Sequence, residues 1–105
     1  MGNFSLKVDF DVAVKFSKEE SYNRLLAYLE KNRLRILQKE APESLFYESK
    51  MSLLSFPREF LVNFVSTNEN ECILKVNVDC NQFDYGLSKK MFSKITEQIY
   101  GVKVV

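Results

Sequence analysis

The segment FSLKVDFDVAVKF, residues 4–16, alternates apolar and polar side chains along its whole length. Successive side chains of a strand point to opposite faces, so this period of two predicts a long β-strand with one apolar face. The apolar positions are Phe4, Leu6, Val8, Phe10, Val12, Val14 and Phe16. A strand of this kind buries its apolar face only within a sheet that has a covering layer, and the rest of the chain must supply both.

Two later segments have the spacing of amphipathic helices. Residues 18–31 carry an i, i+3, i+4, i+7 stripe that starts at Tyr22, and Ser17 with Glu20 forms a capping-box pattern in front of it. The segment LSKKMFSKITEQIYG near the C-terminus carries a second stripe, for which Asp84 or Ser88 is the expected N-cap. Gly101 stands where a glycine normally ends a helix.

The middle of the chain predicts four strands. They are RLRILQK, a strand over about 44–54, EFLVNFVS and CILKVNVDC, separated by turns at Pro42, at Pro57 and at TNENE. Short turns between consecutive strands favour antiparallel pairing. The prediction is one α+β domain over residues 1–105, in the order β-α-β-β-β-β-α, with a five-stranded antiparallel sheet and both helices on one face.

This order of elements resembles the TATA-box-binding-protein-like fold, and within it the START and birch-pollen-allergen superfamily of helix-grip proteins. The resemblance is topological and covers the whole chain, with the first strand, the SFPRE turn with FLVNFV, and LSKKMFSKITEQIYG as its strongest carriers. It implies binding of a fatty acid, a sterol or a polyketide between a curved sheet and the C-terminal helix. The chain is shorter than a START domain usually is, with fewer strands.

The leading functional prediction is therefore non-catalytic binding of a small hydrophobic ligand, a fatty acid or a similar lipid, between sheet and C-terminal helix. A filled core explains the same apolar face, because two helices of roughly 21 and 24 Å together match a strand of roughly 43 Å. Tyr47 and Ser49 are candidates to anchor a head group, or are satisfied by solvent and backbone. The candidate ligand-binding residues are Phe10, Val12, Tyr47, Ser49, Met51, Phe64, Val76, Met91, Phe92 and Ile95.

The alternative prediction is a protein-interaction or homodimerising module with a filled core. It would act through apolar residues on the outer sheet face, namely Ala13, Leu37, Leu61, Val65 and Ile73. Nucleic acid is a disfavoured partner, because the net charge is only +1 and Asp9 and Asp11 lie on the outer face of the first strand. Arg35, Lys39 and Lys50 could meet a carboxylate, although charges on strands usually just face solvent.

The composition argues against the common catalytic chemistries. The chain has no histidine and only three glycines, which removes the usual general base, the Ser-His and Cys-His arrangements, and glycine-rich phosphate loops. Asp9 and Asp11 are better explained as a solvated surface than as a catalytic pair. We expect no enzyme activity, no metal site and no cofactor.

The two cysteines, Cys72 and Cys80, fall in one predicted strand. A strand of eight residues separates them by roughly 26 Å, whereas a disulfide needs Cα atoms within about 7 Å. Free thiols are typical of a reducing compartment, and no secretory signal or membrane-spanning run is visible. We therefore expect a cytoplasmic protein without a membrane span.

Overall fold

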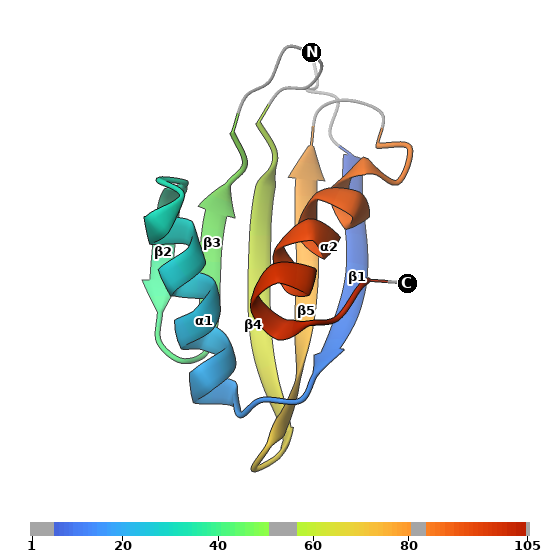
Figure 1. The fold of residues 1–105 in the computed structure, drawn as a ribbon. Coiled ribbons are helices and arrows are strands. Elements are labelled where there is room, and N and C mark those ends of the chain that lie inside the picture. Colours follow the sequence, from blue (N-terminus) through green and yellow to red (C-terminus); the bar gives the residue numbers. More distant parts are fainter. Residues whose placement is uncertain (1–5, 51–56, 81–83, 105) are drawn as a thin grey trace.

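The computed structural model describes residues 6–50, 57–80 and 84–104. Its elements follow the order β-α-β-β-β-β-α, which confirms the order predicted from the sequence (Figure 1). They are β1 (Leu6–Val14), α1 (Lys18–Lys31), β2 (Arg35–Glu40), β3 (Ser44–Glu48), β4 (Glu59–Asn68), β5 (Glu71–Cys80) and α2 (Leu87–Tyr100).

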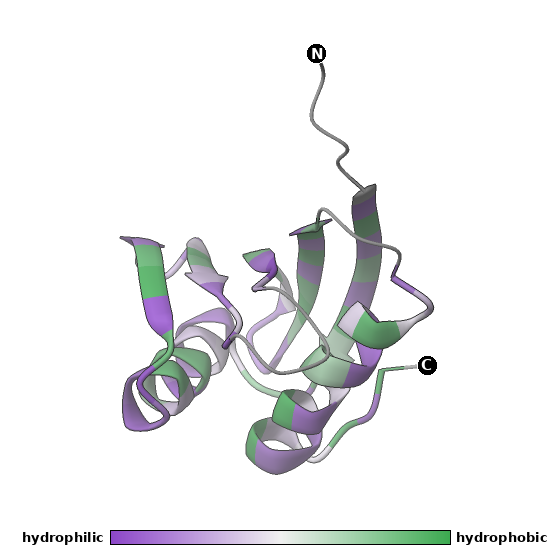
Figure 2. Cartoon of the chain, turned by 90° about the horizontal axis from the view of Figure 1, so that it is seen from above, coloured by the Kyte–Doolittle hydropathy of each residue, from purple (hydrophilic) through white to green (hydrophobic). Residues whose placement is uncertain are grey.

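The five strands form one antiparallel sheet with the order β1-β5-β4-β3-β2. The first two strands of the chain thus lie at opposite edges, and α1 crosses the sheet between them. Both helices cover the same face, with α1 packed against β3, β4 and β5 and α2 lying over β4, β5 and β1 (Figures 1 and 2). The predicted placement of both helices on one side is therefore confirmed.

The alternating strands sort their side chains between the helix-covered face and solvent. In β1, Phe10, Val12 and Val14 are buried, while Lys7, Asp9, Asp11 and Ala13 between them are exposed. The helices contribute Leu25, Leu29 and Phe92, each with no exposed surface. Burial of these apolar side chains is the main stabilising term for such a fold.

The start of α1 and the end of α2 form where the sequence predicts them, but the start of α2 does not. The Ser17 hydroxyl accepts a hydrogen bond from the Glu20 N–H at 3.1 Å and caps α1. For α2 the N-cap residue is Gly86 instead of the predicted Asp84 or Ser88, while the carboxylate of Asp84, two residues earlier, accepts a hydrogen bond from the Ser88 N–H at 3.2 Å. Gly101 ends α2 with φ 74°, a left-handed conformation that glycine adopts without the usual Cβ penalty.

The strand predicted over 44–54 is shorter in the structure. β3 ends at Glu48. The next residue, Ser49, still pairs with Arg58, because its N–H donates to the Arg58 carbonyl at 2.8 Å and its hydroxyl accepts from the Arg58 N–H at 2.8 Å. Residues 51–54 lie outside the described part of the chain. The first strand ends at Val14 instead of residue 16, since the chain turns there towards the cap of α1, and residues 4 and 5 are also outside the described ranges.

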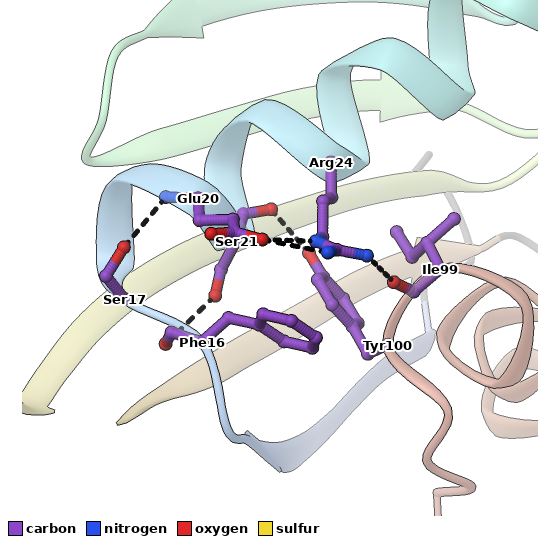
Figure 3. Close-up of polar contacts among 7 residues, drawn as sticks. All are labelled: Phe16, Ser17, Glu20, Ser21, Arg24, Ile99 and Tyr100. Atoms are coloured by element: carbon purple, nitrogen blue, oxygen red, sulfur yellow. Dashed lines mark hydrogen bonds and ion pairs between the residues drawn. The ribbon is translucent and has the colours of Figure 1, made fainter. Parts of the chain in front are cut away.

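Polar contacts fasten the start of α1 to the end of α2 (Figure 3). The Tyr100 hydroxyl donates to the Ser21 carbonyl at 2.6 Å, and Arg24 Nη1 donates to the Ile99 carbonyl at 2.9 Å. The Arg24 guanidinium also lies 4.1 Å from the centre of the Phe16 ring, a cation–π distance. The helices are therefore joined at this end, and Figure 1 shows them diverging towards the C-terminus of α1 and the N-terminus of α2.

Candidate functional site

Where the helices diverge, a cleft of about 270 Å³ opens over β3 and β4. It lies between the C-terminal end of α1, the residues that follow β3, and the middle of α2. Its apolar lining consists of Leu34, Tyr47, Phe60, Met91 and Ile95. Its polar lining consists of Tyr28, Asn32, Ser49, Lys50 and Lys94.

The floor of the cleft is a pair of stacked aromatic rings. Tyr47 of β3 lies directly opposite Phe60 of β4 in the sheet register, and the ring centres are 5.1 Å apart with only 8° between the planes. Phe60 stacks in turn on Phe92 of α2 at 6.2 Å. Because the rings are fixed from below by the sheet and from the side by α2, the floor is rigid and apolar.

The α1 wall is formed by the way the helix ends. Arg33 has φ 57°, and the Leu34 N–H reaches back to the Leu29 carbonyl at 2.9 Å, which is the hydrogen bond of a Schellman ending. The Asn32 side-chain amide donates to the Tyr28 carbonyl at 2.9 Å. This turn directs the chain into β2 and leaves Leu34 half-buried at the edge of the cleft.

A buried arginine lies directly behind the cleft. Arg58 is 1% exposed, its backbone N–H bonds the hydroxyl of Ser49, and its Nη1 lies 3.9 Å from the sulfur of Met91. Its Nε makes no hydrogen bond and lies 3.6 Å from the carboxylate of Asp84. Sequence reasoning missed this ion pair, although Arg58 has the same strand parity as Phe60 and therefore points to the covered face.

The structure divides the candidate residues predicted from the sequence into two groups. Tyr47, Ser49, Met91 and Ile95 come together in the cleft, and Met51 lies outside the described residues. The others belong to the buried core, where the Phe92 ring packs edge-on against Phe10 at 5.8 Å and fills the space beneath α2. The core group is Phe10, Val12, Phe64, Val76 and Phe92.

Several lining residues were not among the predicted set. Tyr28, Asn32, Leu34 and Lys94 reach the cleft only because α1 and α2 diverge, a tertiary feature without a local sequence signal. Lys50, which the sequence raised as a possible carboxylate contact, does line the cleft. Arg35 and Lys39 are exposed positions of β2 and do not line it.

Burial sets the protonation state of the cleft floor. It raises the pKa of Tyr47 well above its ordinary value of 10.0, and the neighbouring Tyr28 and Tyr100 raise it further. The Tyr47 hydroxyl is therefore neutral near pH 7 and offers a hydrogen bond rather than a charge. Burial also raises the pKa of Tyr100, whose hydroxyl holds the two helices together.

These raised pKa values predict an alkaline loss of stability. The unfolded chain releases the two tyrosine protons near pH 10, whereas the folded chain retains them to higher pH. The contribution of the two tyrosines to the free energy of unfolding is thus fully present below pH 10. It is lost as the pH rises above 10, by about 1.4 kcal/mol per pH unit for each tyrosine. Urea unfolding at a series of pH values measures the slope, and Tyr100→Phe should reduce it. An unchanged slope in that variant would contradict the assignment.

Two other depressions lack such a floor. One of about 360 Å³ is walled by α1 and α2 alone, including Arg24, Lys31 and Gln98. The other, of about 230 Å³, lies where β1 ends and β5 begins, near Val102. The outer sheet face aligns Ala13, Ile73 and Val65 across β1, β5 and β4, with Val65 39% exposed. A homodimer through this face stays a prediction.

The described residues contain neither a cluster of metal ligands nor a helix that could span a membrane. Within residues 6–50, 57–80 and 84–104, no three His, Cys, Asp or Glu side chains gather as a metal site would require. Neither helix of that part of the chain is long and apolar enough to cross a bilayer. Cys72 and Cys80 are both free and buried.

The sequence matches no protein-family model and no curated protein. Among solved structures, the chain is similar to a conserved protein of unknown function from Enterococcus faecalis. The TM-score is 0.55 at 10% identity, covering 97% of this chain and 73% of that one. It is also similar to the Zhui aromatase/cyclase from Streptomyces sp. R1128, with a TM-score of 0.52 at 11% identity, covering 90% of this chain and 86% of that one.

These similarities show the fold alone. They support a helix-grip-like α+β arrangement that is shared over nearly the whole chain. Membership of the START superfamily stays a prediction. Because one of the two proteins is an enzyme by name, the absence of catalysis in this chain also stays a prediction.

Proposed function

We propose that the protein binds a small, predominantly apolar molecule in the cleft between its two helices. The observation that carries the proposal is the stacked Tyr47–Phe60 floor, open to a cleft whose walls come from both helices. An apolar concavity with a few polar groups at its edge is the usual form of a small-molecule site. Its volume of about 270 Å³ suits a ligand of modest size.

The cleft is a better candidate than the space beneath α2. Phe92 has no exposed surface and contacts the rings of Phe10 and Phe60, so a ligand there would have to displace a packed core. At the cleft, Met91 and Leu34 are only half-buried. Methionine adapts its shape to an irregular partner, and this suits a wall that must accept a ligand.

Binding without catalysis remains our proposal for the activity. The chain has no histidine, and the raised pKa of Tyr47 makes its hydroxyl a poor general base near neutral pH. The similarity to an aromatase/cyclase supports a fold that holds a small organic molecule. It does not transfer that protein's reaction to this chain.

A neutral fluorescent probe tests the proposal. N-phenyl-1-naphthylamine brightens in apolar sites and carries no charge, so its titration reports occupancy of the cleft. Leu34→Trp replaces an aliphatic side chain at the cleft edge with a larger indole ring that occupies part of the cleft. It should weaken probe binding at least about tenfold. Leu26→Trp is the matched control. Leu26 is a half-buried leucine of α1, as Leu34 is a half-buried leucine just after α1, but Leu26 does not line the cleft.

The same titration can contradict the proposal. Absence of saturable probe binding to the wild-type chain, measured alongside a cooperative unfolding transition, would reject a ligand cleft. Equal binding by the Leu34→Trp and Leu26→Trp variants would place the probe elsewhere on the surface.

A further inference from the structure

Two lysines stand at the edge of the cleft, one on each side. Lys50 follows β3, and Lys94 belongs to the middle of α2. Both are exposed, and neither forms an ion pair or a hydrogen bond with another described residue. They contrast with Lys18 and Lys75, which pair with Glu43 and Asp11 at 2.6 and 4.0 Å.

The lining of the cleft is therefore more positively charged than the molecule as a whole. Of its lining residues within the described ranges, two are cationic and none is acidic. The full chain is nearly balanced, with 15 basic and 14 acidic residues. Asp84, whose carboxylate lies behind the lining beside Arg58, is engaged by Arg58 and by the Ser88 N–H of α2. A positively charged edge above an apolar floor is complementary to a molecule with an anionic end and an apolar body.

We propose, building on the proposed function, that the ligand is a single-chain or small aromatic carboxylate whose anionic end lies between Lys50 and Lys94. Its apolar body extends towards the rings of Tyr47 and Phe60. The reverse orientation would place a charge against the stacked rings without a partner, which costs far more than leaving it in water. The two lysines thus determine both the ligand class and its direction in the cleft.

A matched pair of ligands tests this inference. Decanoate and decan-1-ol have the same chain and differ in charge, and each is titrated as a competitor of N-phenyl-1-naphthylamine at low salt. Two exposed ion pairs should make decanoate bind about three to thirty times more tightly than the alcohol. The preference should shrink at high salt, because screening acts on exposed charges.

The variants locate the effect. Lys50→Met with Lys94→Met should abolish the preference for decanoate while decan-1-ol still binds. Lys7→Met with Lys90→Met is the control, because it removes the same net charge from exposed positions that do not line the cleft. This control should retain the wild-type preference, whereas Lys94→Glu, which leaves one cation opposite one anion at the cleft edge, should abolish it.

The outcomes separate the two proposals. If the neutral probe does not bind, the ligand cleft itself fails. If the probe binds and the two competitors displace it equally, the cleft stands and the inferred anionic ligand is rejected. A preference that the Lys7 and Lys90 substitutions remove as strongly as the cleft substitutions would also reject the role of Lys50 and Lys94, since net charge would then explain it.

Discussion

Replacing Phe92 with alanine is expected to lower the free energy of unfolding by about 3–5 kcal/mol. The side chain has no exposed surface and joins α2 to the sheet through the rings of Phe10 and Phe60, at 5.8 and 6.2 Å. Its removal would leave a cavity between α2 and the sheet that rigid neighbours cannot fill. Urea or thermal unfolding measures the loss.

Met91→Ala is the companion variant, because Met91 is the neighbouring residue on α2 but is half-buried in the cleft. It should cost less than about 2 kcal/mol, well below the range for a fully buried side chain. Binding of the neutral probe should also fall in this variant. If Phe92→Ala left stability nearly unchanged and removed probe binding, Phe92 would be a ligand contact, and the filled core beneath α2 would be disproved.

Arg58→Met is expected to destabilise the fold by about 3–5 kcal/mol, although methionine matches the length of the apolar part of arginine. Arg58 is 1% exposed and Asp84 is 12% exposed, with 3.6 Å between Nε and the carboxylate. Without the guanidinium, the mostly buried carboxylate loses its cation. The same carboxylate accepts a hydrogen bond from the Ser88 N–H in the first turn of α2, so the beginning of that helix should loosen as well.

A double-mutant cycle with Asp84→Asn isolates the ion pair. The double variant should recover at least about 1 kcal/mol relative to the sum of the single variants, because it leaves no unpaired charge behind. Arg35→Met is the surface control, since Arg35 is 74% exposed in its pair with Glu48 and should change stability by less than about 1 kcal/mol. Strict additivity of Arg58→Met and Asp84→Asn would show that the two groups do not interact.

The elements of the fold were predictable because their signals are local. The alternation of residues 4–16 gave the face of β1, and the Ser17 cap and Gly101 gave helix ends that the structure confirms. Strand ends were less predictable. β3 ends at Glu48, where the Ser49 hydroxyl becomes the acceptor for the Arg58 N–H, and a hydroxyl bond between two chain segments has no short-range pattern.

The candidate site was predictable only in part. Met91 and Ile95 were expected as apolar lining and Tyr47 and Ser49 as polar contacts, and all four line the cleft. The apolar pattern also selected five residues of the buried core, because a core and a cleft floor require the same residue types. They are Phe10, Val12, Phe64, Val76 and Phe92. Sequence periodicity tells which face is covered, but it does not tell where the covering layer is incomplete.

The sequence by itself determined that this chain forms an antiparallel sheet with two helices on one side, since side-chain periodicity and capping act over a few residues. Only the tertiary structure decided that the helices join through Tyr100 and Arg24 and part near Leu34. That divergence depends on contacts between residues far apart in the chain. The same long-range packing placed Lys50 and Lys94 across one cleft and buried Arg58 behind it.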